Sequence, residues 1–143
     1  MSFIITVYTN EGIVMASDSR STGSSVQRLP NGSTQTLLGT QITDTTYKTF
    51  KCNERIGLST CGDASINQMP IAGYIEKFIH EKVTAESTVE HVAADVLGYF
   101  TTLCPTLSTH FIVAGYNVNC SSPTIYHVMT EKKTVVNVPT ALP

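Results

Sequence analysis

Two short apolar segments on either side of a turn open the chain, and they constrain its fold more than any other feature. Residues 1–8 (Met-Ser-Phe-Ile-Ile-Thr-Val-Tyr) are rich in β-branched and aromatic side chains, which favour an extended strand. The turn signal Asn10-Glu11-Gly12 follows, and residues 13–20 return as a second strand that ends in Asp-Ser-Arg. The sequence therefore predicts an N-terminal β-hairpin.

Ser2 is a candidate nucleophile because removal of Met1 would make it the first residue of the chain. It would then carry a hydroxyl group and a free α-amine, which titrates close to neutral pH and can accept the hydroxyl proton. Serine or threonine at a free N-terminus is one of the known forms of the activated nucleophile. A retained Met1 would block this chemistry, because the nitrogen of Ser2 would stay in a peptide bond.

Two further blocks carry strand and turn signals. Residues 47–64 place Lys48 on one strand, a polar turn at Asn53-Glu54, a second apolar strand, and Gly62 at the entry to a helix. Residues 111–117 and 124–128 predict another hairpin.

These blocks, in this order, resemble the β-type subunits of proteasomes, which belong to the N-terminal nucleophile hydrolases. In that family an Asp follows the nucleophile by sixteen residues, as Asp18 follows Ser2, and a Gly follows a Lys by fourteen, as Gly62 follows Lys48. The resemblance extends over residues 2–20 and 46–138. It implies an α/β fold (α+β by content), namely a four-layer αββα sandwich of two antiparallel sheets.

The resemblance also implies roles for individual residues. Ser2 would be the nucleophile, and the positive charge of Lys48 would favour its alkoxide. Asp18 would orient Lys48 and pair with it, and the Gly62 N–H would bind the oxyanion. The implied substrate pocket is lined by Ser21, Phe50, Thr60 and Ala64.

Two amphipathic helices are predicted between the second and third blocks. Apolar residues recur at helical spacing over residues 66–82, and Pro70 marks either the start of this helix or a kink. The second helix is expected over residues 88–103, with Ser87 as its N-cap and Glu90 completing a capping box. Two consecutive helices between pairs of strands fit a helical layer on one face of a sheet.

The chain departs from the family pattern in two places. It is longer between Asp18 and Lys48, where a turn signal at residues 30–32 predicts an inserted hairpin over about 22–44. That hairpin could overhang the substrate cleft, form a subunit contact or be a flexible loop. The family fold also continues beyond the predicted strand 134–138. We therefore expect one proteasome-like domain over residues 1–143 without the C-terminal part, as a fragment or as a reduced relative.

Composition argues against several classes of function. The formal net charge is −2 and 14% of the residues are charged, so a basic surface for nucleic acid is not expected. No segment approaches the roughly 20 apolar residues of a membrane span, and no signal peptide opens the chain, which favours a cytoplasmic protein. The histidines and cysteines lack metal-binding spacing, so no metal or cofactor is expected. Free and mostly buried thiols are expected at Cys52, Cys61, Cys104 and Cys120.

Three functional hypotheses follow. The first is a peptidase subunit, a threonine/serine-type endopeptidase that cleaves peptide or protein substrates. The second is a non-catalytic scaffold or binding subunit in which Asp18 and Lys48 form only a structural ion pair. The third is an amidohydrolase of the same superfamily that acts on a small amide.

The expected partners are further copies of the chain, arranged in a ring or in stacked dimers, and a regulatory ATPase is left open as a partner. Contacts between copies are expected at residues 69–78 and at the turn 30–32. Uncovered apolar side chains are expected on the last strands, at Ile125, Val128, Val135, Val136 and Val138.

Overall fold

The computed structural model describes residues 2–9 and 11–140 and has a five-stranded antiparallel sheet at its centre. The strand order is β11-β10-β9-β6-β5. Strands β6 and β9, far apart in the sequence, pair from Ile56 with Gly115 to Gly62 with Thr109 in the middle of this sheet. The five strands are β5 (Thr49–Lys51), β6 (Ile56–Gly62), β9 (Thr109–Gly115), β10 (Thr124–Met129) and β11 (Thr134–Val138).

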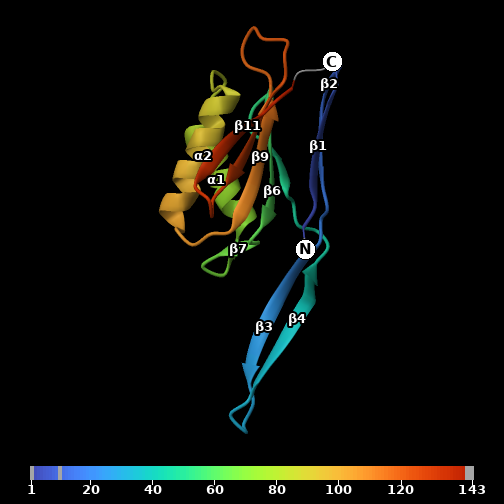
Figure 1. Cartoon of the computed structure of the whole chain (residues 1–143), viewed down its shortest axis with the longest axis vertical. Helices are drawn as coiled ribbons and strands as arrows, with labels where there is room; N and C mark the ends of the chain where they lie inside the picture. Colours follow the sequence, from blue (N-terminus) through green and yellow to red (C-terminus); the bar gives the residue numbers. More distant parts are fainter. Residues whose placement is uncertain (1, 10, 141–143) are drawn as a thin grey trace.

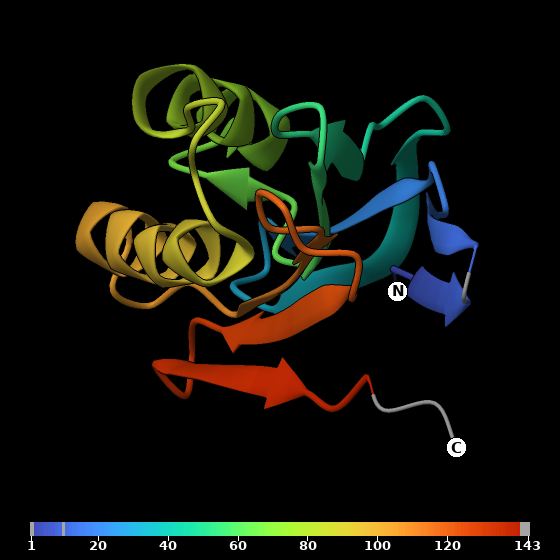
Figure 2. The same cartoon turned by 90° about the horizontal axis from the view of Figure 1, so that it is seen from above.

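Helices α1 (Ile71–Lys82) and α2 (Val89–Leu103) cover one face of the sheet (Figures 1 and 2). Phe78 of α1, Phe100 of α2 and Phe111 of β9 are fully buried between the two layers. The ring centroids of Phe100 and Phe111 lie 4.8 Å apart. Each buried phenyl ring stabilises the fold by about 1.5–3 kcal/mol relative to exposure. Within the described part of the chain, neither helix is long and apolar enough to cross a membrane.

Helix α1 starts later than the sequence predicts. Ile66 lies in the short strand β7 (Ser65–Ile66) and pairs with Met69 of β8 (Met69–Pro70). Pro70, with ψ of 134°, stands immediately before the helix, where its missing N–H and fixed φ cost nothing. The expected helix over residues 66–82 is therefore wrong in its first turn, and the proline marks the start of the helix.

The N-cap of α2 also differs from the prediction. The hydroxyl of Thr88, and not that of Ser87, accepts the His91 N–H at 3.2 Å. Ser87 instead accepts the Thr84 N–H in the preceding turn, at 3.0 Å. Ser87 and Thr88 could each cap the helix, but the Ser87 hydroxyl is already bonded in the turn, so Thr88 is the N-cap.

The predicted N-terminal hairpin is formed by β1 (Ile4–Thr9) and β2 (Gly12–Ser17), which pair from Ile4 with Ser17 to Thr9 with Gly12. It lies on the side of the five-stranded sheet opposite to the helices (Figure 1). In the described residues this hairpin has no further sheet neighbour. The chain is thus an α+β fold with two helices on one face of a sheet and a two-stranded hairpin on the other.

Strand β1 carries apolar side chains on both faces. Ile4 and Tyr8 point toward the five-stranded sheet and line a cavity of about 290 Å³ there. The opposite face is exposed, at Phe3, Ile5 and Val7, and continues across the hairpin at Val14, which is 68% exposed. Strands with such continuous apolar character are typical of inner layers.

The last strands are better covered than expected. Val128 is fully buried under the helices and Ile125 is buried on the other face. Val135 packs against the helical core and Val138 lines the cavity, so Val136, 45% exposed, is the exception. Phe78 is likewise buried, so it cannot take part in the contact between copies expected at residues 69–78.

Strands β3 (Ser21–Arg28) and β4 (Thr34–Thr43) form a second hairpin, which projects from the body (Figure 1). We call it the arm. It lies over the residues, about 22–44, for which the sequence predicts a hairpin. Its turn is closed by the Leu29 N–H, which donates to the Ser33 carbonyl at 2.8 Å, and Gly32 supplies a φ of 81°. All residues of the outer half, 26–36, are exposed.

Substitution of Gly115 tests the close packing of β9 on β6, and substitution of Gly98 in α2 is the control. A Cβ at Gly115 would lie 2.2 Å from the Arg55 carbonyl oxygen, whereas a Cβ at Gly98 in α2 would meet nothing within 4 Å. We expect Gly115→Ala to lower the free energy of unfolding by about 1–3 kcal/mol. Gly98→Ala should raise it by about 0.5–1 kcal/mol, because alanine favours a helix. Chemical denaturation measures both changes, and equal effects would contradict the packing.

Candidate active site

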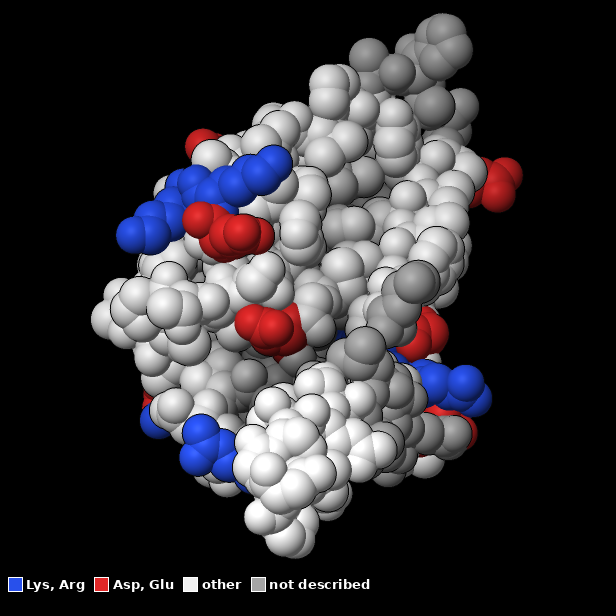
Figure 3. Space-filling view, turned by 60° about the horizontal axis from the view of Figure 1, so that its bottom comes forward, with Lys and Arg blue, Asp and Glu red and all other residues white. Residues whose placement is uncertain are grey.

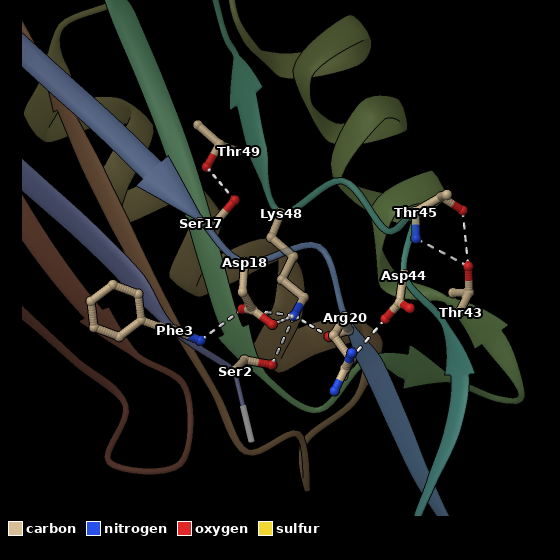
Figure 4. Close-up of polar contacts among 10 residues, drawn as sticks. All are labelled: Ser2, Phe3, Ser17, Asp18, Arg20, Thr43, Asp44, Thr45, Lys48 and Thr49. Carbon is tan, nitrogen blue, oxygen red and sulfur yellow. Dashed lines mark hydrogen bonds and ion pairs between the residues drawn. The ribbon is translucent and has the colours of Figure 1, made fainter.

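Lys48 is the centre of the candidate site, and its side chain is only 5% exposed. Its Nζ donates to both carboxylate oxygens of Asp18 at 2.9 Å and to the Arg20 carbonyl oxygen at 2.5 Å. The same Nζ lies 3.2 Å from the Ser2 Oγ (Figure 4). The structure thus brings together Ser2, Asp18 and Lys48, which lie far apart in the sequence.

Asp18 is held from two directions. Its Oδ1 accepts the Phe3 N–H at 2.8 Å, and its own N–H donates to the Phe3 carbonyl oxygen at 3.0 Å. Burial raises the pKa of this carboxyl group, but the hydrogen bond from Phe3 and the contact with Lys48 outweigh burial. The pKa of Asp18 therefore lies below its ordinary value of 3.8. At neutral pH Asp18 is an anion that neutralises Lys48.

Arg20 and Asp44 close the base of the arm beside this pair. The Arg20 Nε donates to the Asp44 Oδ1 at 2.9 Å, and the Thr46 N–H donates to the Ser19 carbonyl oxygen at 2.9 Å. Because the Arg20 carbonyl also accepts from Lys48, the base of the arm is bonded directly to the site (Figure 4). The sequence did not reveal this contact, since any residue carries a carbonyl group.

Gly62 ends β6 next to Lys48 and has a φ of 124°. A Cβ there would lie 2.5 Å from the Ser108 carbonyl oxygen, so only glycine fits. The neighbouring amides give the direction of its N–H. Asp63 donates toward β9, to Ser108 at 3.0 Å, whereas Thr60 donates to the Lys48 carbonyl at 2.8 Å. Alternate amides of a strand point the same way, so the Gly62 N–H points to the Lys48 side.

A small pocket beside Ser2 contains part of the expected substrate site. Thr60 and Ala64 line it together with Gly62, and its volume of about 20 Å³ holds about one water molecule. The Thr60 hydroxyl is buried and has no hydrogen-bond partner in the described part of the chain. The structure does not bring the other two expected residues to this pocket. Phe50 is buried in the helical core and Ser21 is buried where the arm begins.

A pair of histidines lies under the N-terminal hairpin, and the sequence did not predict that they would be in contact. His110 Nδ1 and His127 Nε2 lie 2.9 Å apart in the cavity of about 290 Å³, and their rings are stacked. Burial lowers the pKa of His127, and the neighbouring His110 lowers it further. The histidines looked scattered because only the register of β9 and β10, which places His127 opposite Ile112, brings them together.

The four thiols are free, but the expectation that most are buried is wrong. Burial raises the pKa of Cys52 to about 12, so this thiol is unreactive. The structure has no group of three or more potential metal ligands among residues 2–9 and 11–140. Cys61 and Cys104 are partly buried and Cys120 is exposed.

The lowered pKa of Asp18 predicts a pH dependence of stability. A carboxyl group with a depressed pKa in the folded state stabilises the fold above its unfolded pKa of about 3.9, and this contribution is lost as the pH falls. We expect the free energy of unfolding to fall below about pH 4, and the Asp18→Asn variant to show a shallower decline. Urea unfolding between pH 2 and pH 6 measures the slope.

Glu86→Gln, which changes an exposed carboxyl group, serves as the control for that experiment. It should leave the slope as in the wild type. Equal slopes for wild type and Asp18→Asn would show that the Asp18 contact does not stabilise the fold.

Comparison with known proteins bears on the fold. No model of a known protein family and no curated protein matches the sequence. Among solved structures, the chain is similar to the Gly-1 mutant of Anbu from Hyphomicrobium sp. strain MC1, with a TM-score of 0.63 and 14% identity. The match covers 97% of this chain and 56% of that chain, so this chain spans little more than half of its length. The fold is therefore similar to that of Anbu, a proteasome-like protein, over the region that the two share.

Proposed function

We propose that the chain is a proteasome-like peptidase subunit whose Ser2, exposed by removal of Met1, attacks peptide bonds. One observation carries the proposal: the buried Lys48 ammonium lies 3.2 Å from the Ser2 Oγ while Asp18 holds it in place. A positive charge at this distance favours the alkoxide form of the hydroxyl group. The free α-amine of Ser2 would accept the hydroxyl proton, directly or through a water molecule.

The remaining steps use groups beside the same pocket. The Gly62 N–H, which points to the Lys48 side, would stabilise the oxyanion of the tetrahedral intermediate. The α-ammonium of Ser2 would return its proton to the amide nitrogen, the C–N bond would break, and the amine product would leave an acyl ester on Ser2. Water then hydrolyses the ester and restores the free hydroxyl group. The buried Thr60 hydroxyl, which has no hydrogen-bond partner among the described residues, is available to orient the substrate.

We also propose that the protein acts in the cytoplasm as a homo-oligomer with the complete four-layer αββα arrangement. The exposed apolar face at Phe3, Ile5, Val7 and Val14 supports a further layer on the N-terminal hairpin.

Two observations are also compatible with the alternative functions, a non-catalytic scaffold subunit and an amidohydrolase. The ion pair of Asp18 and Lys48 joins separate segments, which is also what a non-catalytic scaffold subunit would need. The pocket of about 20 Å³ has room for about one water molecule and not for an amino-acid side chain, so it gives no support for a peptide substrate over a small amide.

A peptide epoxyketone distinguishes the peptidase from the scaffold, because the reagent needs both the hydroxyl group and the free α-amine. We expect mass spectrometry of the untagged protein to show a chain that starts at Ser2 and gains one reagent per chain. Lys48→Met should slow the formation of this adduct by about 100-fold or more, because the charge beside Ser2 is lost.

Ser2→Ala is the matched control, since it keeps a small first residue and a free amine but removes the hydroxyl group. It should form no adduct. A wild-type protein that keeps Met1 and stays unlabelled would refute the catalytic proposal and favour the scaffold. Labelling by the epoxyketone without peptide cleavage, but with hydrolysis of small amides, would favour the amidohydrolase.

A further inference from the structure

The outer half of the arm, residues 26–36, is exposed along its whole length, both in the strand residues 26–28 and 34–36 and in the turn that joins them. A lone two-stranded hairpin is at best marginally stable in water. Natural edge strands are usually protected by charges or proline, but β4 contains neither, and the only charged residue of the arm is Arg28. The arm therefore has the character of an element that packs against another molecule.

The charged side chains of the arm and of the body indicate which molecule the arm binds. Arg28 forms no ion pair in the described part of the chain. Two exposed carboxylates, Asp63 and Glu131, also lack a basic partner among the described residues and flank Ser108. The Ser108 N–H donates to the Asp63 Oδ2 at 2.8 Å, and its hydroxyl donates to the Glu131 Oε2 at 3.2 Å. Figure 3 brings the end with the arm forward and shows acidic side chains exposed there.

We propose that the arm of one copy docks on the body of a second copy, with Arg28 between Asp63 and Glu131 of that copy. Arg28, Asp63 and Glu131 form no ion pair among the described residues of one copy, so a second copy of the chain supplies the complementary charge. Two copies related by a two-fold axis would exchange arms, and each would make the same contact. The eight residues of β3 span about 26 Å, so the turn of the arm can contact a neighbouring subunit.

The exchange also reaches the candidate active site. Asp63 lines the pocket beside Ser2, so the arm of the second copy forms an additional wall of that pocket. At its base the arm is joined to Lys48 through the Arg20 carbonyl. One contact between copies therefore touches both active sites. This inference rests on the homo-oligomer of the proposed function, but it does not require that Ser2 be catalytic.

Light scattering of the purified full chain at micromolar concentrations tests the proposal. The wild type should contain at least two copies. Arg28→Glu and Glu131→Arg should each weaken association by about tenfold or more, because each places like charges together. Combining the two substitutions reverses the pair of residues 28 and 131 and should restore association in part, because Asp63 still faces the new carboxylate. Lys51→Glu, at an exposed ion pair near the far end of β5, is the matched control and should have no effect.

A monomeric wild type would overturn the proposal, and so would an Arg28→Glu variant that associates as the wild type does. A double variant that associates no better than Arg28→Glu alone would also overturn it. Circular dichroism confirms that each exposed substitution leaves the fold intact. The epoxyketone experiment is scored independently. An associated but unlabelled protein refutes the catalytic function and leaves the arm contact standing, whereas a labelled monomer does the opposite.

Discussion

The contact between the buried Lys48 ammonium and Asp18 is the interaction on which the assembly of the site depends. Three segments meet at the Lys48 Nζ, namely the residues before β1 with Ser2, the end of β2 with Asp18, and the base of the arm with the Arg20 carbonyl. The two hairpins are separate sheets, and neither joins the five-stranded sheet as a strand. Lys48, which leads into β5, therefore fastens both hairpins to the body of the molecule.

The cost of burial explains why this arrangement is specific. Taking an ammonium group out of water costs several kcal/mol, so Lys48 is stable only where its acceptors are all in place. The Phe3 N–H and the backbone of Arg20 contribute to this environment, so the local backbone must adopt one conformation for the charge to be satisfied. The same set of contacts serves a catalytic subunit and a scaffold equally well. A free amine on Ser2, which only removal of Met1 would give, is the chemical feature that a catalytic subunit needs and a scaffold does not.

The sequence predicted the elements whose signals are local. The strand–turn–strand pattern at the N-terminus and the apolar stripe of α2 led to the right elements, and the spacing of Ser2, Asp18 and Lys48 led to residues that meet in space. Backbone partners such as the Arg20 carbonyl could not be predicted, since no side chain marks them. The burial of Phe50 depends on which face of β5 lies under the helices, and the histidine pair depends on the register of β9 and β10. Both are properties of tertiary packing.

The apolar character of β1 on both faces has a consequence for how the hairpin finds its orientation. A strand with one apolar face is oriented by hydrophobic burial alone, because turning it over would expose that face. If β1 were turned over, Ile5 would be buried in place of Ile4, and the free energy of hydrophobic burial would change little. Polar contacts therefore decide which face of β1 lies against the five-stranded sheet. The Thr49 hydroxyl donates to the Ser17 Oγ at 2.9 Å, and the Lys48 Nζ donates to the Asp18 carboxylate. The ion pair of Asp18 and Lys48 thus determines which face of the hairpin packs on the sheet. It therefore also determines that the Ser2 side chain lies beside Lys48.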